Sequence, residues 1–144
     1  IDTLKIGIEL GMTFIDTAEV YGEGHSEEIV GSAIIGHRDD VFIATKVSPE
    51  HLSYDDVQKA AESSLRRLKI DCIDLFQVHW PNPNIPMEET MRAMERLISD
   101  GKIKHIGVSN FSLSQMKHVG AFLGNSIVSS LQSEYNLFDR SVEK

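Results

Sequence analysis

The chain has 144 residues, of which 41% are hydrophobic and 25% are charged, and its formal net charge is -8 at pH 7. This length is sufficient for one domain with a buried core, and the acidic balance gives no electrostatic reason to expect nucleic acid or an anionic membrane as a partner. No apolar run approaches the roughly 20 residues that span a bilayer, and the beginning of the chain lacks the pattern of a signal peptide. The single cysteine, Cys72, cannot form an internal disulfide. We therefore expect one domain over residues 1-144 and a cytoplasmic protein.

The chain begins with a helical pattern that gives way to a strand. Apolar residues recur at helical spacing from Ile1 to Ile8, and the pattern stops at Gly11. The next apolar run, from Thr13 to Asp16, is too short and too β-branched for a helix. It predicts a buried strand that ends on a carboxylate, with the phenol of Tyr21 on the loop beyond it.

Four further pairs of elements follow in the same alternation. Three of the predicted helices begin at a serine that can cap them and one begins at a proline, and apolar residues recur every three or four positions in each. These helices are predicted over residues 26–36, 53–68, 86–101 and 112–124, and the strands over residues 41–47, 73–79, 103–110 and 127–132.

Strands that alternate with helices through short loops predict a parallel sheet with the helices packed outside it. Two α/β architectures fit this order, an open doubly wound sheet and part of a (β/α) barrel. A doubly wound dinucleotide fold is expected to carry a G-x-G-x-x-G turn after a strand, and no strand-to-helix junction of this sequence has one. The pattern therefore favours a partial barrel of about five βα units.

Polar residues lie near the ends of all five predicted strands. Because the carboxyl ends of parallel strands meet on one face, we expect these side chains to surround a common mouth, with Tyr21 above it. The residues are Asp16, Lys46, His79, Ser109, Asn110 and Gln132.

Alternation along the strands predicts which side chains point into the barrel. If Lys46 points inward, Thr45 faces the helices, and the same count places Gln77 inside together with His79. A buried amide needs a hydrogen-bond partner, and the sequence does not identify one for Gln77.

These residue types indicate a chemistry. An ammonium group next to a phenol stabilises the phenolate and makes the phenol a better proton donor near neutral pH. Asp16 would hold Lys46 in place, and the imidazole of His79 could hydrogen-bond the oxygen of a bound carbonyl. The reaction indicated is carbonyl reduction with a general acid, in which a cofactor supplies the hydride because no side chain can. The polar groups of Ser109, Asn110 and Gln132 could hold an amide such as a nicotinamide carboxamide.

Seven short stretches carry a family pattern and run nearly from end to end of the chain, at residues 14–22, 26–27, 44–46, 74–80, 101–103, 106–111 and 132–136. In their order and spacing they resemble the aldo-keto reductase superfamily, and specifically its bacterial members. The resemblance implies a (β/α)8 TIM barrel, of which this chain carries strands 2 to 6, and the reduction of aldehydes and ketones with NADPH.

Position by position, the resemblance also implies roles for individual residues. Tyr21 corresponds to the general acid, and the residues that complete the catalytic tetrad are Asp16, Lys46 and His79. The nicotinamide of NADP(H) would lie on Ser109, Asn110 and Gln132, and Trp80 would form an aromatic wall of the pocket for a small carbonyl substrate. No arginine occupies the matched strand ends, so we expect broad acceptance of small aldehydes. No metal site is expected.

A complete barrel needs about 250 residues, and the family's first strand and last two strands have no counterpart here. We therefore expect a single incomplete barrel domain, which is a fragment that self-associates through its open edges and is inactive by itself. Two other functions remain open. Some relatives of this family act as regulatory, channel-associated subunits, and a metal-dependent barrel hydrolase is opposed by the lack of a His-x-His pattern on any strand end.

Overall fold

Five parallel strands form one sheet in the order of the sequence. In the computed structural model, which describes residues 1–143, each strand pairs with its neighbour in sequence. The strands are β1 (Phe14–Asp16), β2 (Phe42–Val47), β3 (Ile73–Val78), β4 (Ile103–Ser109) and β5 (Val128–Gln132). The architecture is a half-barrel, which confirms the partial barrel predicted from the alternation of strands and helices.

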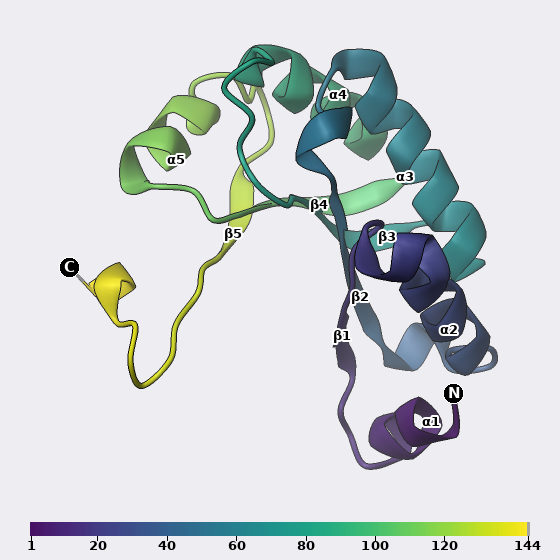
Figure 1. Cartoon of the computed structure of the whole chain (residues 1–144). Helices are drawn as coiled ribbons and strands as arrows, with labels where there is room; N and C mark the ends of the chain where they lie inside the picture. Colours follow the sequence, from purple (N-terminus) through teal and green to yellow (C-terminus); the bar gives the residue numbers. More distant parts are fainter. Residues whose placement is uncertain (144) are drawn as a thin grey trace.

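The helices lie along the outer side of this curved sheet, except the first, which lies beyond the amino end of β1 and contacts the second helix (Figure 1). They are α1 (Asp2–Glu9), α2 (His25–Ala33), α3 (Tyr54–Leu68), α4 (Met87–Ser99) and α5 (Leu113–Gly120). Short 3-10 helices are η1 (Tyr21–Gly24), η2 (Arg38–Asp40), η3 (Pro49–His51) and η4 (Ser141–Glu143). No helix in the described part of the chain has the length and apolar character needed to cross a membrane.

Two of the predicted helix caps are present and one is wrong. The Ser53 hydroxyl accepts from the backbone of Asp56 at the start of α3, and Ser112 forms a capping box with Gln115 at the start of α5. Ser26, however, does not cap α2, because the chain already turns into the helix at Gly24, whose φ of 92° is left-handed. The hydroxyl of Ser26 instead accepts a hydrogen bond from Thr17.

Helix α5 ends at Gly120 and not at Gly124, where the sequence pattern predicted its end. The backbone N–H groups of Gly124 and Asn125 donate to Glu95 Oε1 of α4, at 2.8 and 3.2 Å. These contacts fix the chain in a turn before β5, so the helical pattern does not continue.

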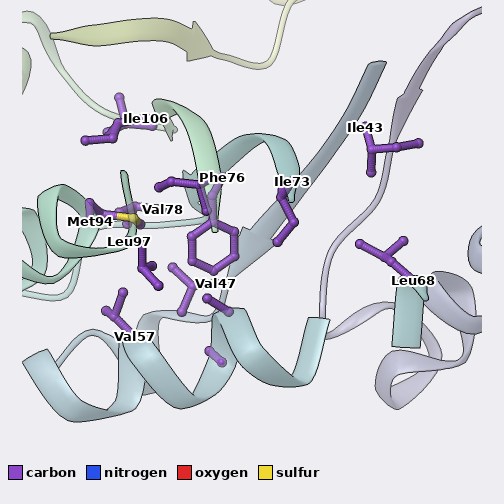
Figure 2. Packing of buried hydrophobic residues seen from close by; sticks show 14 of the residues in the cluster. Ile43, Val47, Val57, Leu68, Ile73, Phe76, Val78, Met94, Leu97 and Ile106 are labelled. Atoms are coloured by element: carbon purple, nitrogen blue, oxygen red, sulfur yellow. The ribbon is translucent and has the colours of Figure 1, made fainter. Parts of the chain in front are cut away.

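The hydrophobic core lies between the sheet and the helices α2, α3 and α4. Figure 2 shows Phe76 at its centre, pointing from β3 toward the helices. Met91 and Met94 of α4 are fully buried in this core, as expected for the apolar residues that recur at helical spacing over residues 86–101. The alternation predicted for β2 is also confirmed, because Lys46 points to the inner face and Thr45 to the helices.

Helix α2 crosses the end of α3 at very short range, and the contact is made at Gly31. A Cβ added to Gly31 would lie 2.5 Å from the carbonyl oxygen of Leu68 and 2.6 Å from that of Arg67. Since both neighbours are backbone atoms, neither can move without displacing a helix.

We therefore predict that Gly31→Ala lowers the free energy of unfolding by about 1–3 kcal/mol, the usual cost of overpacking. The matched control is Gly120→Ala in α5, where an added Cβ meets nothing within 4 Å. That change should be neutral or stabilise the protein by at most about 1 kcal/mol, because alanine is the better helix former. Urea unfolding of both variants measures the difference, and equal effects would contradict the close-packing argument.

Candidate active site

The carboxyl ends of the strands bring the predicted site residues to one edge of the sheet. Asp16 is the last residue of β1, Ser109 of β4 and Gln132 of β5. Lys46 is the last residue but one of β2, and His79 directly follows β3. The parallel register aligns these ends, because Lys46 is opposite Gln77 and Ser109 is opposite Gln132.

An ion pair joins β1 to β2 at this edge. Lys46 Nζ lies 2.6 Å from Asp16 Oδ2, and it also donates to the carbonyl oxygen of Thr17 at 2.9 Å. Only 2% of the Lys46 side chain is exposed, against 28% for Asp16. A buried ammonium group must be paired and hydrogen-bonded to remain charged, and these two contacts meet that requirement.

Tyr21 lies over the ion pair, at the start of η1. Lys46 Nζ is 5.3 Å from the centre of the Tyr21 ring, and the ring meets the imidazole of His79 edge to face at a centroid distance of 5.7 Å. The residue is 42% exposed, so its side chain is accessible from the mouth of the half-barrel. Asp16, Lys46, Tyr21 and His79 therefore form one group, as the strand-end argument predicted.

Three consecutive left-handed residues shape the loop that carries Tyr21. They are Gly22, Glu23 and Gly24, with φ values of 58°, 56° and 92°. Two of them are glycines, which adopt this conformation without steric cost.

Glu27 supports the loop that carries Tyr21 from the side of the helices, through hydrogen bonds that we did not predict from the sequence. The carboxylate is fully buried and accepts from Thr45 Oγ1 at 2.6 Å and from Arg67 Nε at 2.7 Å. Arg67 also packs against Gly24, where an added Cβ would lie 2.7 Å from its Cδ. The signals in the sequence were the outward position of Thr45, which places a hydroxyl between β2 and the helices, and the place of residues 26–27 among the stretches that resemble the family.

The environment of His79 lowers the pKa of its imidazole below 6.5. Burial is the largest cause, and the positive charge of Lys46 adds to it, while Asp16 and Glu19 act weakly in the opposite direction. The imidazole is therefore neutral at pH 7, and a neutral ring has one N–H to donate.

The remaining predicted residues lie in three different settings. Asn110, which has a left-handed φ of 62°, donates from Nδ2 to the carbonyl oxygen of His79 and to Ser109 Oγ, both at 3.0 Å. Gln132 instead reaches the ion pair, because its Nε2 lies 3.3 Å from Asp16 Oδ2. Trp80 directly follows His79 and is 52% exposed.

Within residues 1–143, no group of three or more His, Cys, Asp and Glu side chains is arranged to hold a metal ion. The chemistry available at this edge is that of an ion pair, a phenol, a neutral imidazole and three polar side chains.

The chain is similar to known proteins over its whole length. The model of the aldo/keto reductase family matches residues 1–144. Aldo-keto reductase YhdN of Bacillus subtilis is 44% identical over 154 residues, which cover 100% of this chain and 46% of the relative. Methylglyoxal reductase YeaE of Escherichia coli is 42% identical over 140 residues, which cover 97% of this chain and 49% of the relative. The chain thus spans about half the length of these curated relatives.

Solved structures give the same result. The thermostable aldo-keto reductase Tm1743, in complex with the inhibitor epalrestat, superposes with a TM-score of 0.96 at 44% identity, covering 99% of this chain and 52% of that one. An aldo/keto reductase from Klebsiella pneumoniae, in complex with NADP and acetate, has a TM-score of 0.91 at 40% identity, covering 99% and 50%.

The lowered pKa of His79 predicts a loss of stability in acid. As the pH falls below 6.5, the unfolded chain takes up a proton at this imidazole while the folded chain does not, so protonation favours unfolding. As the pH is lowered through 6.5, the free energy of unfolding should therefore decrease more steeply in the wild type than in His79→Gln. Thermal unfolding across this range measures the difference, and an NMR titration of the imidazole with a midpoint above 6.5 would contradict the prediction.

Proposed function

Because the chain belongs to the aldo/keto reductase family, we propose that the complete protein reduces aldehydes and ketones to alcohols with NADPH, and that Tyr21 is its general acid. The observation that carries this proposal is the group formed by Tyr21, Lys46, Asp16 and His79 at one edge of the sheet. The family relatives include an enzyme named as a methylglyoxal reductase, which acts on a small carbonyl compound.

In the proposed mechanism Tyr21 donates a proton to the carbonyl oxygen of the substrate. The phenolate that remains is stabilised by the ammonium group of Lys46, which lies 5.3 Å from the centre of the ring. Asp16 holds that ammonium group in position through its 2.6 Å contact. The neutral imidazole of His79 donates its N–H to the same carbonyl oxygen and so orients the substrate.

The side chains Ser109, Asn110 and Gln132 would hold the carboxamide of the nicotinamide, which supplies the hydride when the cofactor is bound. Their chemistry fits a primary amide, because each offers both a donor and an acceptor. Among the described residues, Asn110 and Gln132 form their hydrogen bonds through the amide nitrogens. Both carbonyl oxygens are therefore left to accept from a ligand.

Trp80 is the proposed wall of the substrate pocket. It follows His79 directly in the chain, and half of its side chain is exposed. An aromatic face next to a hydrogen-bond donor suits small apolar aldehydes and ketones. None of the proposed site residues is an arginine that would select a substrate carboxylate.

The first test is Tyr21→Phe in the complete protein. The rate of NADPH-dependent reduction of small aldehydes should fall about 10²–10⁴-fold, the usual contribution of a positioned general acid. NADPH binding, measured by fluorescence, should remain near normal, because the hydroxyl is proposed to contact only the substrate. The control is Tyr54→Phe in α3, whose ring packs under Arg92, and it should keep full activity. A Tyr21→Phe rate within about tenfold of the wild type would overturn the assignment.

We also propose that residues 1–144 form one incomplete barrel domain, and this can be tested by expressing the domain separately. Strand β1 pairs only with β2, and β5 only with β4, among the described residues. Phe14, which stacks on Phe42 at the inner face, is 61% exposed. Free strand edges next to exposed aromatic rings favour association.

The isolated 144-residue chain should therefore be a dimer or larger by light scattering, and it should not reduce aldehydes with NADPH. Phe14→Lys should lower the apparent mass, because it places a charge beside the free edge of β1. A wild-type chain that is monomeric and turns over substrate would contradict this proposal.

A further inference from the structure

Gln77 carries a buried amide directly below the proposed catalytic group. It lies in the middle strand β3, points to the inner face and is 2% exposed. Its Nε2 donates to Asp16 Oδ1 at 3.4 Å, and its Oε1 accepts from Ser130 Oγ at 3.3 Å. One side chain thus spans the interior from β1 to β5, and these are the partners that the sequence did not identify.

The space for this amide depends on Gly107 of β4. A Cβ on Gly107 would lie 2.8 Å from Gln77 Cγ and would collide with Ser130 Oγ. The register between β4 and β5 also shifts by one residue between Ile106 and Gly107. Glycine and the register shift together bring Ser130 within reach of Gln77.

The two oxygens of Asp16 have different partners. Oδ2 receives Lys46 Nζ at 2.6 Å and Gln132 Nε2 at 3.3 Å. Oδ1 receives only Gln77 among the side chains that the structure describes. The terminal torsion of an aspartate is broad and two-fold, so a donor on each oxygen is what fixes the plane of the carboxylate.

The amide itself has only one favourable orientation. An ionised carboxylate accepts hydrogen bonds and cannot donate them, so the NH₂ group of Gln77 must face Asp16. Its carbonyl oxygen then faces Ser130, whose hydroxyl can donate to it. The carboxylate thus determines which end of the amide faces it, and the hydrogen bond from Ser130 holds the other end in place.

We propose that Gln77 is a positioning residue, which orients Asp16 and through it the Lys46 ammonium group beneath Tyr21. This inference rests on the proposed function, because its effect on rate is expressed through the proton donated by Tyr21. If Gln77 only packed the interior, any side chain of the same size would serve as well. The test must therefore remove the amide donor while keeping the volume of the side chain.

Gln77→Met in the complete protein removes the amide and keeps the length of the side chain. We expect kcat for small aldehydes to fall about 10–100-fold, taking as a guide the loss of a hydrogen-bond partner that orients a metal ligand. NADPH affinity and the KM for the aldehyde should change little. The matched control is Thr90→Val, which removes another buried donor, to the carbonyl oxygen of Leu52 at 2.7 Å. It should lower the unfolding temperature without lowering kcat.

Gln77→Glu separates the donor from the shape of the side chain. At neutral pH the introduced carboxylate cannot donate to Asp16, and kcat should fall at least as far as in Gln77→Met. As the pH is lowered, the two carboxyl groups can share one proton, and the donor returns. The kcat of Gln77→Glu relative to wild type should therefore recover in acid, while that of Gln77→Met should not.

The outcomes distinguish this inference from the proposed function. A wild-type protein that reduces no aldehyde with NADPH refutes the function. An active wild type with unchanged kcat in Gln77→Met refutes the inference alone. Crystal structures give a readout that needs no activity. A turned Asp16 carboxylate or a displaced Lys46 Nζ in Gln77→Met supports the inference, and unchanged positions of both overturn it.

Discussion

The arrangement of side chains at the carboxyl ends of the strands depends on one constraint, the burial of the Lys46 ammonium group. A charge that is nearly removed from water is tolerated only where its partners are fixed, and the two partners of Lys46 both come from the end of β1. Strands β1 and β2 must therefore keep the register that pairs Asp16 with Ala44. Asp16 in turn needs a donor for its other oxygen, and Gln77 of β3 supplies it.

The two faces of β2 carry two separate polar networks. Lys46 binds Asp16 on the inner face, and its neighbour Thr45 binds Glu27 on the outer face. Glu27 lies in the first turn of α2, just after the loop that carries Tyr21, and its second partner, Arg67, packs against that loop. Consecutive residues of one strand thus connect the ion pair to the loop above it. Buried charges of this kind seldom add stability over apolar packing.

The sequence was sufficient to predict what depends on local pattern. Alternation gave the five strands and the inward direction of Lys46, and helical periodicity gave the buried methionines of α4. It was not sufficient where contacts between residues far apart in the sequence determine the structure. Gln77 finds Asp16 across 61 positions, and nothing near either residue indicates the contact. Ser26 failed as a cap for a related reason, since Thr17 of the preceding loop engages its hydroxyl and Gly24 makes the turn.

The strict sequence order of the strands has a consequence for how the protein folds. Each strand pairs with the one made just before it across a single helical crossover, so every pairing is as local as a parallel sheet allows. The partners of Asp16 arrive in succession, because Lys46 is 30 positions away, Gln77 is 61 and Gln132 is 116. Synthesis from the N-terminus would thus supply the carboxylate first and its donors one strand at a time. One edge of the growing sheet is always the newest strand, which the next strand to emerge covers, while β1 remains the other edge throughout.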